Sequence, residues 1–133
     1  METKIALGAF VTALAMAGAA ASTAIAAAPH ASAAGRHVFE TNCAGCHGAT
    51  GMGLAGAFPP LAGNDVVTGD HKKLIAILNN GLNGPIEVKG AKYNGQMPAW
   101  KGNLTPKQIA DVATYIRNAW GNKADAITEA EVK

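Results

Sequence analysis

Two cysteines and a histidine stand within five residues, Cys43-Ala44-Gly45-Cys46-His47, and the sequence holds no other cysteine. On a short turn of helix, two thiols three residues apart can each form a thioether bond to one vinyl group of a haem. The adjacent histidine can then reach the iron. We therefore expect the chain to fold around one covalently attached haem.

Three other kinds of site share part of this pattern. A thioredoxin-like redox pair has the same cysteine spacing but follows a strand, whereas the residues before Cys43 have a helical pattern. A zinc site needs further ligands, and only His30, His37 and His71 remain, scattered along the chain. A disulfide between positions 43 and 46 would close a loop too short to stabilise the fold much.

The first third of the sequence differs from the rest. Residues 1–33 are mostly Ala, Gly and aliphatic residues, and no charge interrupts residues 5–28. We interpret residues 1–33 as a secretory signal peptide, cleaved after the small-x-small pattern Ala31-Ser32-Ala33 or a few residues earlier. An uncleaved membrane anchor is the alternative, but strongly apolar side chains are few here, so insertion would be weakly driven.

Composition and charge agree with an exported haem domain. Export to the periplasm would place the cysteines outside the cytosol, which suits covalent attachment. The net charge of +2 does not change when residues 1–33 are removed, because Glu2 and Lys4 cancel. Two haem propionates would bring the net charge near zero, so the charge does not indicate binding to nucleic acid. Aromatic residues make up only 5% of the chain, so its side chains offer little material for a hydrophobic core. A haem at the centre would supply the apolar surface that the core lacks. We therefore expect the apoprotein to be poorly folded.

Two stretches flank the cysteine motif. A helix is predicted over residues 35–46, with Val38 and Phe39 on its apolar face, and it delivers the motif to the haem. Residues 48–63 are rich in glycine and contain Pro59-Pro60, which predicts a loop with tight turns. Glycine would let this loop lie close against a flat ligand.

Weaker signals follow this loop. A second helix should begin with a cap near Thr68 or Asp70 and end near Gly81. Alternating apolar residues between positions 86 and 93, around Lys89-Gly90-Ala91, predict a small hairpin.

The last helix has the strongest end signals in the chain. Thr105 and Gln108 form a capping box, and Pro106 occupies the first helical position. An apolar stripe then continues to Trp120, and Gly121 should close the helix. Residues 123–133 have no periodic core face and are expected to form a tail.

A second informative stretch is Tyr93-Asn94-Gly95-Gln96-Met97-Pro98-Ala99-Trp100. A six-coordinate haem iron needs a ligand on the face opposite His47, and a soft thioether in a loop suits it. Met52 is close to His47 in sequence and would struggle to reach that face, while His71 would give a bis-histidine site. We therefore predict His47 and Met97 as the axial ligands.

Together these landmarks resemble the class I cytochromes c, of the bacterial single-haem kind, across residues 34–122. The resemblance implies an all-α cytochrome c fold, with three to five helices wrapped around one covalently attached haem c. It also implies that Gly35 and Phe39 of the first helix cross Val112 and Tyr115 of the last helix.

The resemblance further implies roles for residues around the haem. Cys43 and Cys46 would hold it covalently. Pro59, twelve residues after His47, falls where a proline carbonyl accepts the hydrogen bond of the ligand histidine. Leu61 falls where a leucine packs on the haem, and position 97 falls in the loop of the distal ligand.

The function implied by this resemblance is electron transfer in the periplasm, with no catalysis of its own, between redox enzymes of a respiratory chain. Residues 58–63 and 95–100 are similar to cytochrome domains that serve dehydrogenases, nitrite reductases or terminal oxidases. The alternative is therefore an electron-accepting haem subunit of such a complex. A haem enzyme, handling peroxide or nitric oxide, would instead need an iron with an open position.

The expected partners are redox proteins, and the chain would be a monomer or one subunit of a complex. Contact with a membrane is expected only if the N-terminal segment is not cleaved. Several lysines could form a basic rim that steers an acidic partner, or could simply be a solvated surface: Lys72, Lys73, Lys89, Lys92 and Lys101.

Overall fold

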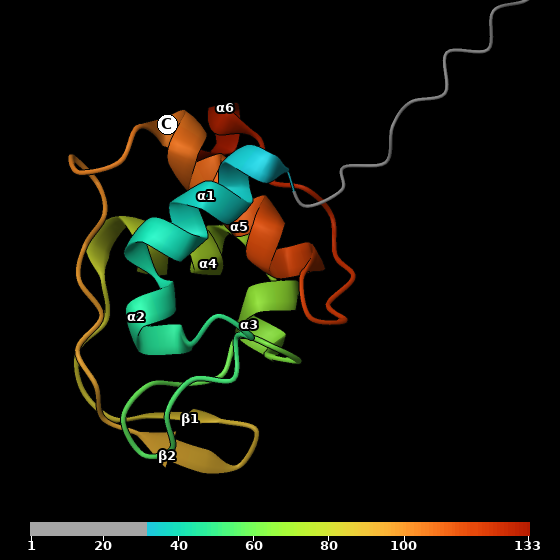
Figure 1. Ribbon diagram of the computed structural model, residues 1–133. Helices are drawn as coiled ribbons and strands as arrows, with labels where there is room; N and C mark the ends of the chain where they lie inside the picture. The colour runs from blue at the N-terminus through green and yellow to red at the C-terminus, as the bar shows by residue number, and fades with distance from the viewer. Residues whose placement is uncertain (1–31) are drawn as a thin grey trace, which may run out of the picture.

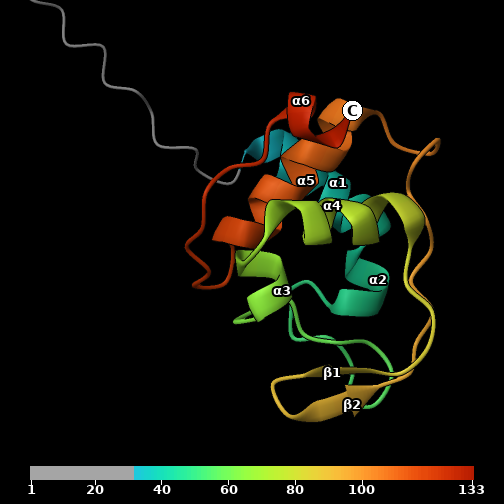
Figure 2. The same ribbon diagram turned by 180° about the vertical axis from the view of Figure 1, so that it is seen from behind.

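The computed structural model describes residues 32–133, so the predicted signal peptide lies outside the described residues apart from Ser32 and Ala33. The fold is mostly helical, with a small hairpin at the opposite end of the molecule from the C-terminal helix (Figures 1 and 2). In chain order the elements are α1 (Ala33–Asn42), α2 (Ala44–His47), α3 (Asp65–Thr68), α4 (His71–Asn80), β1 (Ile86–Val88), β2 (Ala91–Tyr93), α5 (Pro106–Asn118) and α6 (Glu129–Val132).

The first and last long helices, α1 and α5, cross at close range. A side chain at Gly35 would overlap the backbone carbonyl of Asp111, so only glycine permits this approach. Phe39 is buried beside Val112, and its ring centroid lies 5.5 Å from that of Tyr115. The contact pair predicted between these helices is confirmed.

Local end signals place most helix boundaries correctly. The Asp70 side chain accepts a hydrogen bond from the Lys72 amide at the start of α4, and the capping box predicted at the start of α5 is present. Helix α5 ends at Asn118, however, two residues before Trp120, which has the positive φ of 52°. The Trp120 ring leaves the helical stripe because it packs against residues far away in the sequence.

The predicted hairpin is present as two antiparallel strands, in which Ile86 pairs with Tyr93 and Val88 with Ala91. The short helix α3 was not predicted. Its N-cap is Asn64, whose side chain accepts a hydrogen bond from the Val66 amide. Four residues are too few to show a helical period, so only this cap marks the helix.

The expectation that residues 123–133 form a tail was wrong. Ile127 and Val132 are buried in the core, and the Ile127 amide donates to the Thr114 hydroxyl of α5. The Glu131 carboxylate lies 2.7 Å from Nδ1 of His71 at the start of α4. Ile127 lies in a loop and Val132 in the four-residue helix α6, so the two give no period and the pattern could not predict their burial.

The side chain of Arg117 joins three parts of the chain around this segment. Its guanidinium donates to the carbonyl oxygens of Val67 and Gly69 at 2.8 and 2.9 Å, and to that of Asp125 at 2.7 Å. The residue is only 2% exposed.

Within residues 32–133, none of the helices has both the length and the apolar character needed to cross a bilayer.

Candidate haem-binding site

Two adjoining cavities, of about 140 and 210 Å³, lie between the α2 region and the segment that follows the hairpin. Their walls are mainly apolar, with side chains from α1, α4 and α5 at the inner end. The two cavities form one cleft, because the same six residues line both: Cys43, His47, Pro59, Leu82, Ile86 and Met97.

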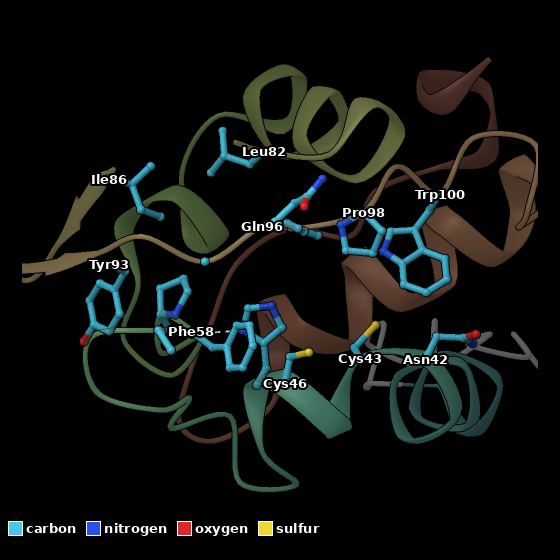
Figure 3. Close-up of a pocket in the computed structure, with 15 residues that line it drawn as sticks. Asn42, Cys43, Cys46, Phe58, Leu82, Ile86, Tyr93, Gln96, Pro98 and Trp100 are labelled. Carbon is cyan, nitrogen blue, oxygen red and sulfur yellow. Dashed lines mark hydrogen bonds between the residues drawn. The ribbon is translucent and has the colours of Figure 1, made fainter. Parts of the chain in front are cut away.

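The walls of this cleft come from segments far apart in the sequence (Figure 3). Cys43 and Cys46 lie on one side, at the corner between α1 and α2. Gln96 and Pro98 lie across from them, and the hairpin residues Ile86 and Tyr93 close one end. Sequence reasoning predicted both main walls, one from the cysteine motif and the other from the stretch around position 97.

The cysteine pair stands on a break between two helices. Cys43 ends α1 with its amide bonded to the Phe39 carbonyl at 2.8 Å, and its own carbonyl accepts from the His47 amide at 3.0 Å in α2. Cys43 is half-buried and Cys46 is exposed. Burial raises the pKa of the Cys43 thiol to about 11, and the neighbouring Cys46 adds to this effect. Both sulfurs border the smaller cavity, where a group in the cleft could bond to them.

His47 is buried, and a hydrogen bond fixes the orientation of its ring. Its Nδ1 lies 2.9 Å from the Pro59 carbonyl oxygen. Because a carbonyl can only accept, Nδ1 carries the proton and Nε2 keeps a free lone pair. Burial lowers the pKa of His47, although the bond to Pro59 acts in the opposite direction. The ring is therefore neutral at pH 7, as a metal ligand must be.

The glycine-rich loop brings the Pro59 carbonyl to His47. The Gly53 amide donates to the His47 carbonyl at 2.7 Å, and the Leu61 amide donates to the Gly51 carbonyl at 2.7 Å. A Cβ on Gly53 would overlap the Phe58 carbonyl, and the φ of Gly53 is +67°. The loop can close on itself in this way only with glycine at that position.

Trp120 holds this loop from outside, a role that the sequence did not predict. A Cβ on Gly51 would overlap the Trp120 ring, and the indole Nε1 donates to the Ala49 carbonyl at 3.2 Å. The ring also packs at 4.9 Å on Phe39. No local signal could find this contact, because it joins positions 71 residues apart in the chain.

Met97 is half-buried against the core and fixed to the end of α4. Two backbone bonds of 2.9 and 3.0 Å join Met97 and Leu82 in both directions. Gly81, with a φ of +73°, leaves the room that the Met97 carbonyl needs. The segment is anchored again where the Trp100 amide donates to the Leu78 carbonyl at 3.0 Å.

The structure does not bring the other candidate ligands into the cleft. Met52 is 65% exposed and lines neither cavity. His71 is paired with Glu131 at the start of α4. In the part of the chain that the structure describes, no three His, Cys, Asp or Glu side chains gather as a metal site. A helix and not a strand precedes Cys43, which disfavours a thioredoxin-like pair.

Comparison with known families agrees with this geometry. The sequence profile of the family described as cytochrome c matches residues 32–120, which include both walls of the cleft. The chain belongs to the cytochrome c family. Members of this family bind haem c covalently, and the cysteine motif of this cytochrome fits that attachment.

Several curated proteins are similar to this cytochrome. Cytochrome c-552 of Thermus thermophilus is 48% identical over 84 residues, which are 60% of this chain and 63% of that protein. Cytochrome c6 of Tetradesmus obliquus is 34% identical over 87 residues, 62% of this chain and 83% of that one. The cytochrome c subunit of a quinone alcohol dehydrogenase from Gluconobacter oxydans is 37% identical over 99 residues, 73% of this chain but 20% of that subunit. The chain thus spans less than two thirds of the first of these relatives.

The residues of the cleft fit haem c on chemical grounds. A covalently attached haem c needs an apolar slot, two thiols at its edge, and a neutral nitrogen or soft sulfur that can bind the metal. The cleft of this cytochrome has mainly apolar walls, and Cys43, Cys46, His47 and Met97 all line it. Leu61 lines only the larger cavity, where it can contribute apolar surface.

Proposed function

We propose that this cytochrome carries single electrons on one haem c between redox proteins in the periplasm and catalyses no reaction of its own. Cys43 and Cys46 would hold the haem through thioether bonds, and His47 Nε2 and Met97 Sδ would bind its iron. One observation carries the proposal: His47, oriented by Pro59, and Met97 line the same cleft together with the cysteine Cys43.

Two protein ligands decide what this site can do. Bound haem supplies an iron that changes oxidation state by one electron, and a thioether ligand favours its reduced form. If His47 and Met97 both bound this iron, they would leave no position for oxygen or peroxide. The Pro59 carbonyl keeps the Nδ1 proton of His47 in place and so raises the basicity of the ligand nitrogen.

The substitution Met97→Ala tests this assignment, and Met52→Ala is its control. Without Met97 the haem stays attached, the reduction potential falls, and imidazole binds the ferric protein on the order of 100-fold more tightly, because no internal ligand competes. Spectroscopic titration with imidazole and potentiometry measure both effects. Met52 is exposed outside the cleft, so Met52→Ala should match wild type. Wild-type behaviour of Met97→Ala would show that Met97 is not the ligand.

A second candidate function is that of a haem subunit within a larger enzyme complex. The similarity to subunits of a quinone alcohol dehydrogenase, a gluconate 2-dehydrogenase and a cbb3-type cytochrome c oxidase supports it, at 33–40% identity. Gel filtration of native extract, followed by haem absorbance, separates the two. A free carrier elutes near the mass of one small domain, and a subunit elutes with its complex.

Location in the periplasm depends on export through the signal peptide at residues 1–33. Ser32 bears on the cleavage site, because its side chain caps α1 by accepting a 3.0 Å hydrogen bond from the Gly35 amide. Cleavage before Ala34 would remove this cap, whereas an earlier cleavage keeps it. The intact mass of the exported protein identifies the site. Full-length protein in the membrane fraction would favour the uncleaved anchor instead.

A further inference from the structure

The loop after the cysteine motif is an unusual surface because it carries no charge. No Asp, Glu, Lys or Arg occurs between Glu40 and Asp65. Met52 and Leu54, in this loop, are 65% and 58% exposed, and they are the exposed large hydrophobic residues of the part that the structure describes. Surfaces of soluble domains usually mix both charges throughout. An uncharged stretch of this length, with two large apolar side chains in solvent, is typical of a contact surface.

Hydrogen bonds hold these apolar side chains in a fixed place. The Leu54 amide donates to the Phe58 carbonyl at 2.8 Å, and the Phe58 amide donates back at 2.8 Å. Between Met52 and Leu54, the Gly53 amide is bonded to the His47 carbonyl at 2.7 Å. These bonds already order the loop, so a partner that contacts Met52 and Leu54 would bind with little further loss of loop entropy.

The uncharged surface continues on the other wall of the cleft. Residues 93–100 also contain no charged side chain. They meet the loop where the Asn94 amide donates to the Gly56 carbonyl at 3.3 Å and where Gly95 packs against Phe58. We call residues 44–58 and 93–100 together the uncharged collar. The collar contains Cys46, which is exposed and lines the cleft.

Electrons enter and leave where the cofactor edge meets solvent. Because Cys46 is exposed, a haem bonded to it would be reached from the surface inside the uncharged collar, and a partner close enough for transfer would cover the collar. A highly charged partner face would lose hydration there and find no opposite charge in return. An uncharged apolar face would instead bury Met52 and Leu54 favourably.

We propose that the uncharged collar is the docking surface for a redox protein whose own cofactor edge is ringed by uncharged, apolar side chains, an inference that rests on the electron-carrier function. Lys92 and Lys101 flank residues 93–100 and lie outside the collar. Association through the collar is therefore only weakly sensitive to salt, unlike steering by a basic rim.

Electron self-exchange between two copies of the holoprotein tests this inference, because a second copy presents the uncharged apolar face that the proposal requires. One electron passes from the reduced to the oxidised copy, with no bond formed or broken. NMR line broadening in mixtures of the two forms gives the rate. Between low and high salt, the wild-type rate should change by less than about twofold, as expected for uncharged faces.

Met52→Lys and Leu54→Lys each add one charge to the collar, and both positions are exposed enough to accept lysine. Each should lower the rate about tenfold at low salt, with recovery as salt screens the repulsion between two modified faces. Ala130→Lys is the matched control. It adds the same charge on α6, at the opposite end from the hairpin and the adjoining loop (Figures 1 and 2), and should stay within about twofold of wild type.

Two results would overturn the docking inference: equal rates in the collar variants and the Ala130→Lys control, or a wild-type rate that rises steeply with salt because charged faces repel. Absorption spectra and potentials of the same samples keep the two proposals apart. Normal spectra with unaffected rates refute the docking surface alone. A wild-type protein without a six-coordinate haem refutes the electron-carrier function, and the docking surface with it.

Discussion

At the scale of single residues, the site depends on backbone carbonyls as much as on side chains. The Pro59 carbonyl decides which nitrogen of His47 faces the cleft, and the Gly51 carbonyl holds the turn that presents Pro59. Trp120 covers Gly51 from outside. A change at Gly51 should therefore reach His47 through the backbone of the loop.

Gly51→Ala tests this path, and Gly56→Ala is its control. Both glycines have a positive φ, +67° and +74°, so alanine at either costs about 1–2 kcal/mol of unfolding free energy. Only at Gly51 would the new methyl meet the Trp120 ring, which adds about 1–3 kcal/mol. Denaturant unfolding of the holoprotein measures the difference, and potentiometry should find a shifted potential in Gly51→Ala alone. Equal losses in both variants would show that Trp120 does not hold the loop.

At the scale of helices and loops, local signals predicted well and distant contacts did not. The Asp70 cap, the Thr105 capping box and the hairpin were readable because each depends on residues a few positions apart. The end of α5 and the burial of Ile127 were missed because contacts far along the chain decide them. In the same way, the cysteine motif and the Met97 stretch predicted the walls of the cleft, whereas nothing near Trp120 indicated its position over the loop.

The packing of α6 should depend on pH through Glu131. Hydrogen bonds from His71, and then from the amide and hydroxyl of Thr128, lower the pKa of Glu131 to about 2 from an ordinary value of 4.5. Because the folded pKa is the lower one, this carboxylate contributes its full stability above pH 4.5 and loses it as the pH falls toward 2. Above pH 5 the variant Glu131→Gln should therefore unfold at lower denaturant concentration than wild type.

The difference between wild type and Glu131→Gln should shrink as the pH falls from 4.5 to 2, because wild-type Glu131 then also becomes neutral. Urea unfolding at several pH values measures it. Glu129→Gln is the control, since Glu129 pairs with Lys133, the residue that follows α6, and not with α4. A difference that stays constant over this pH range would mean that the Glu131 charge does not hold α6 to α4.

At the scale of the whole molecule, the core is built in two halves. One half is the crossing of α1 and α5, packed by side chains alone, and the other is the cleft between α2, α4 and the hairpin. The walls of this cleft are mainly apolar. A haem bound there would remove this surface from water, which stabilises the fold by about 25 cal/mol for each Å² of apolar surface buried. Bound haem would thus be a large part of the core of this protein.

The double variant Cys43→Ala, Cys46→Ala separates covalent attachment from folding. It should lose haem staining on a denaturing gel, whereas Met52→Ala should retain it. Purified without haem, the double variant should show weakened helical circular dichroism and no cooperative thermal unfolding, because side chains alone leave the second half of the core unpacked. Added haem should restore helix by binding through His47 and Met97 without the thioethers. Retained staining would contradict covalent attachment through the cysteines, and cooperative unfolding of the haem-free protein would contradict the role of haem as core.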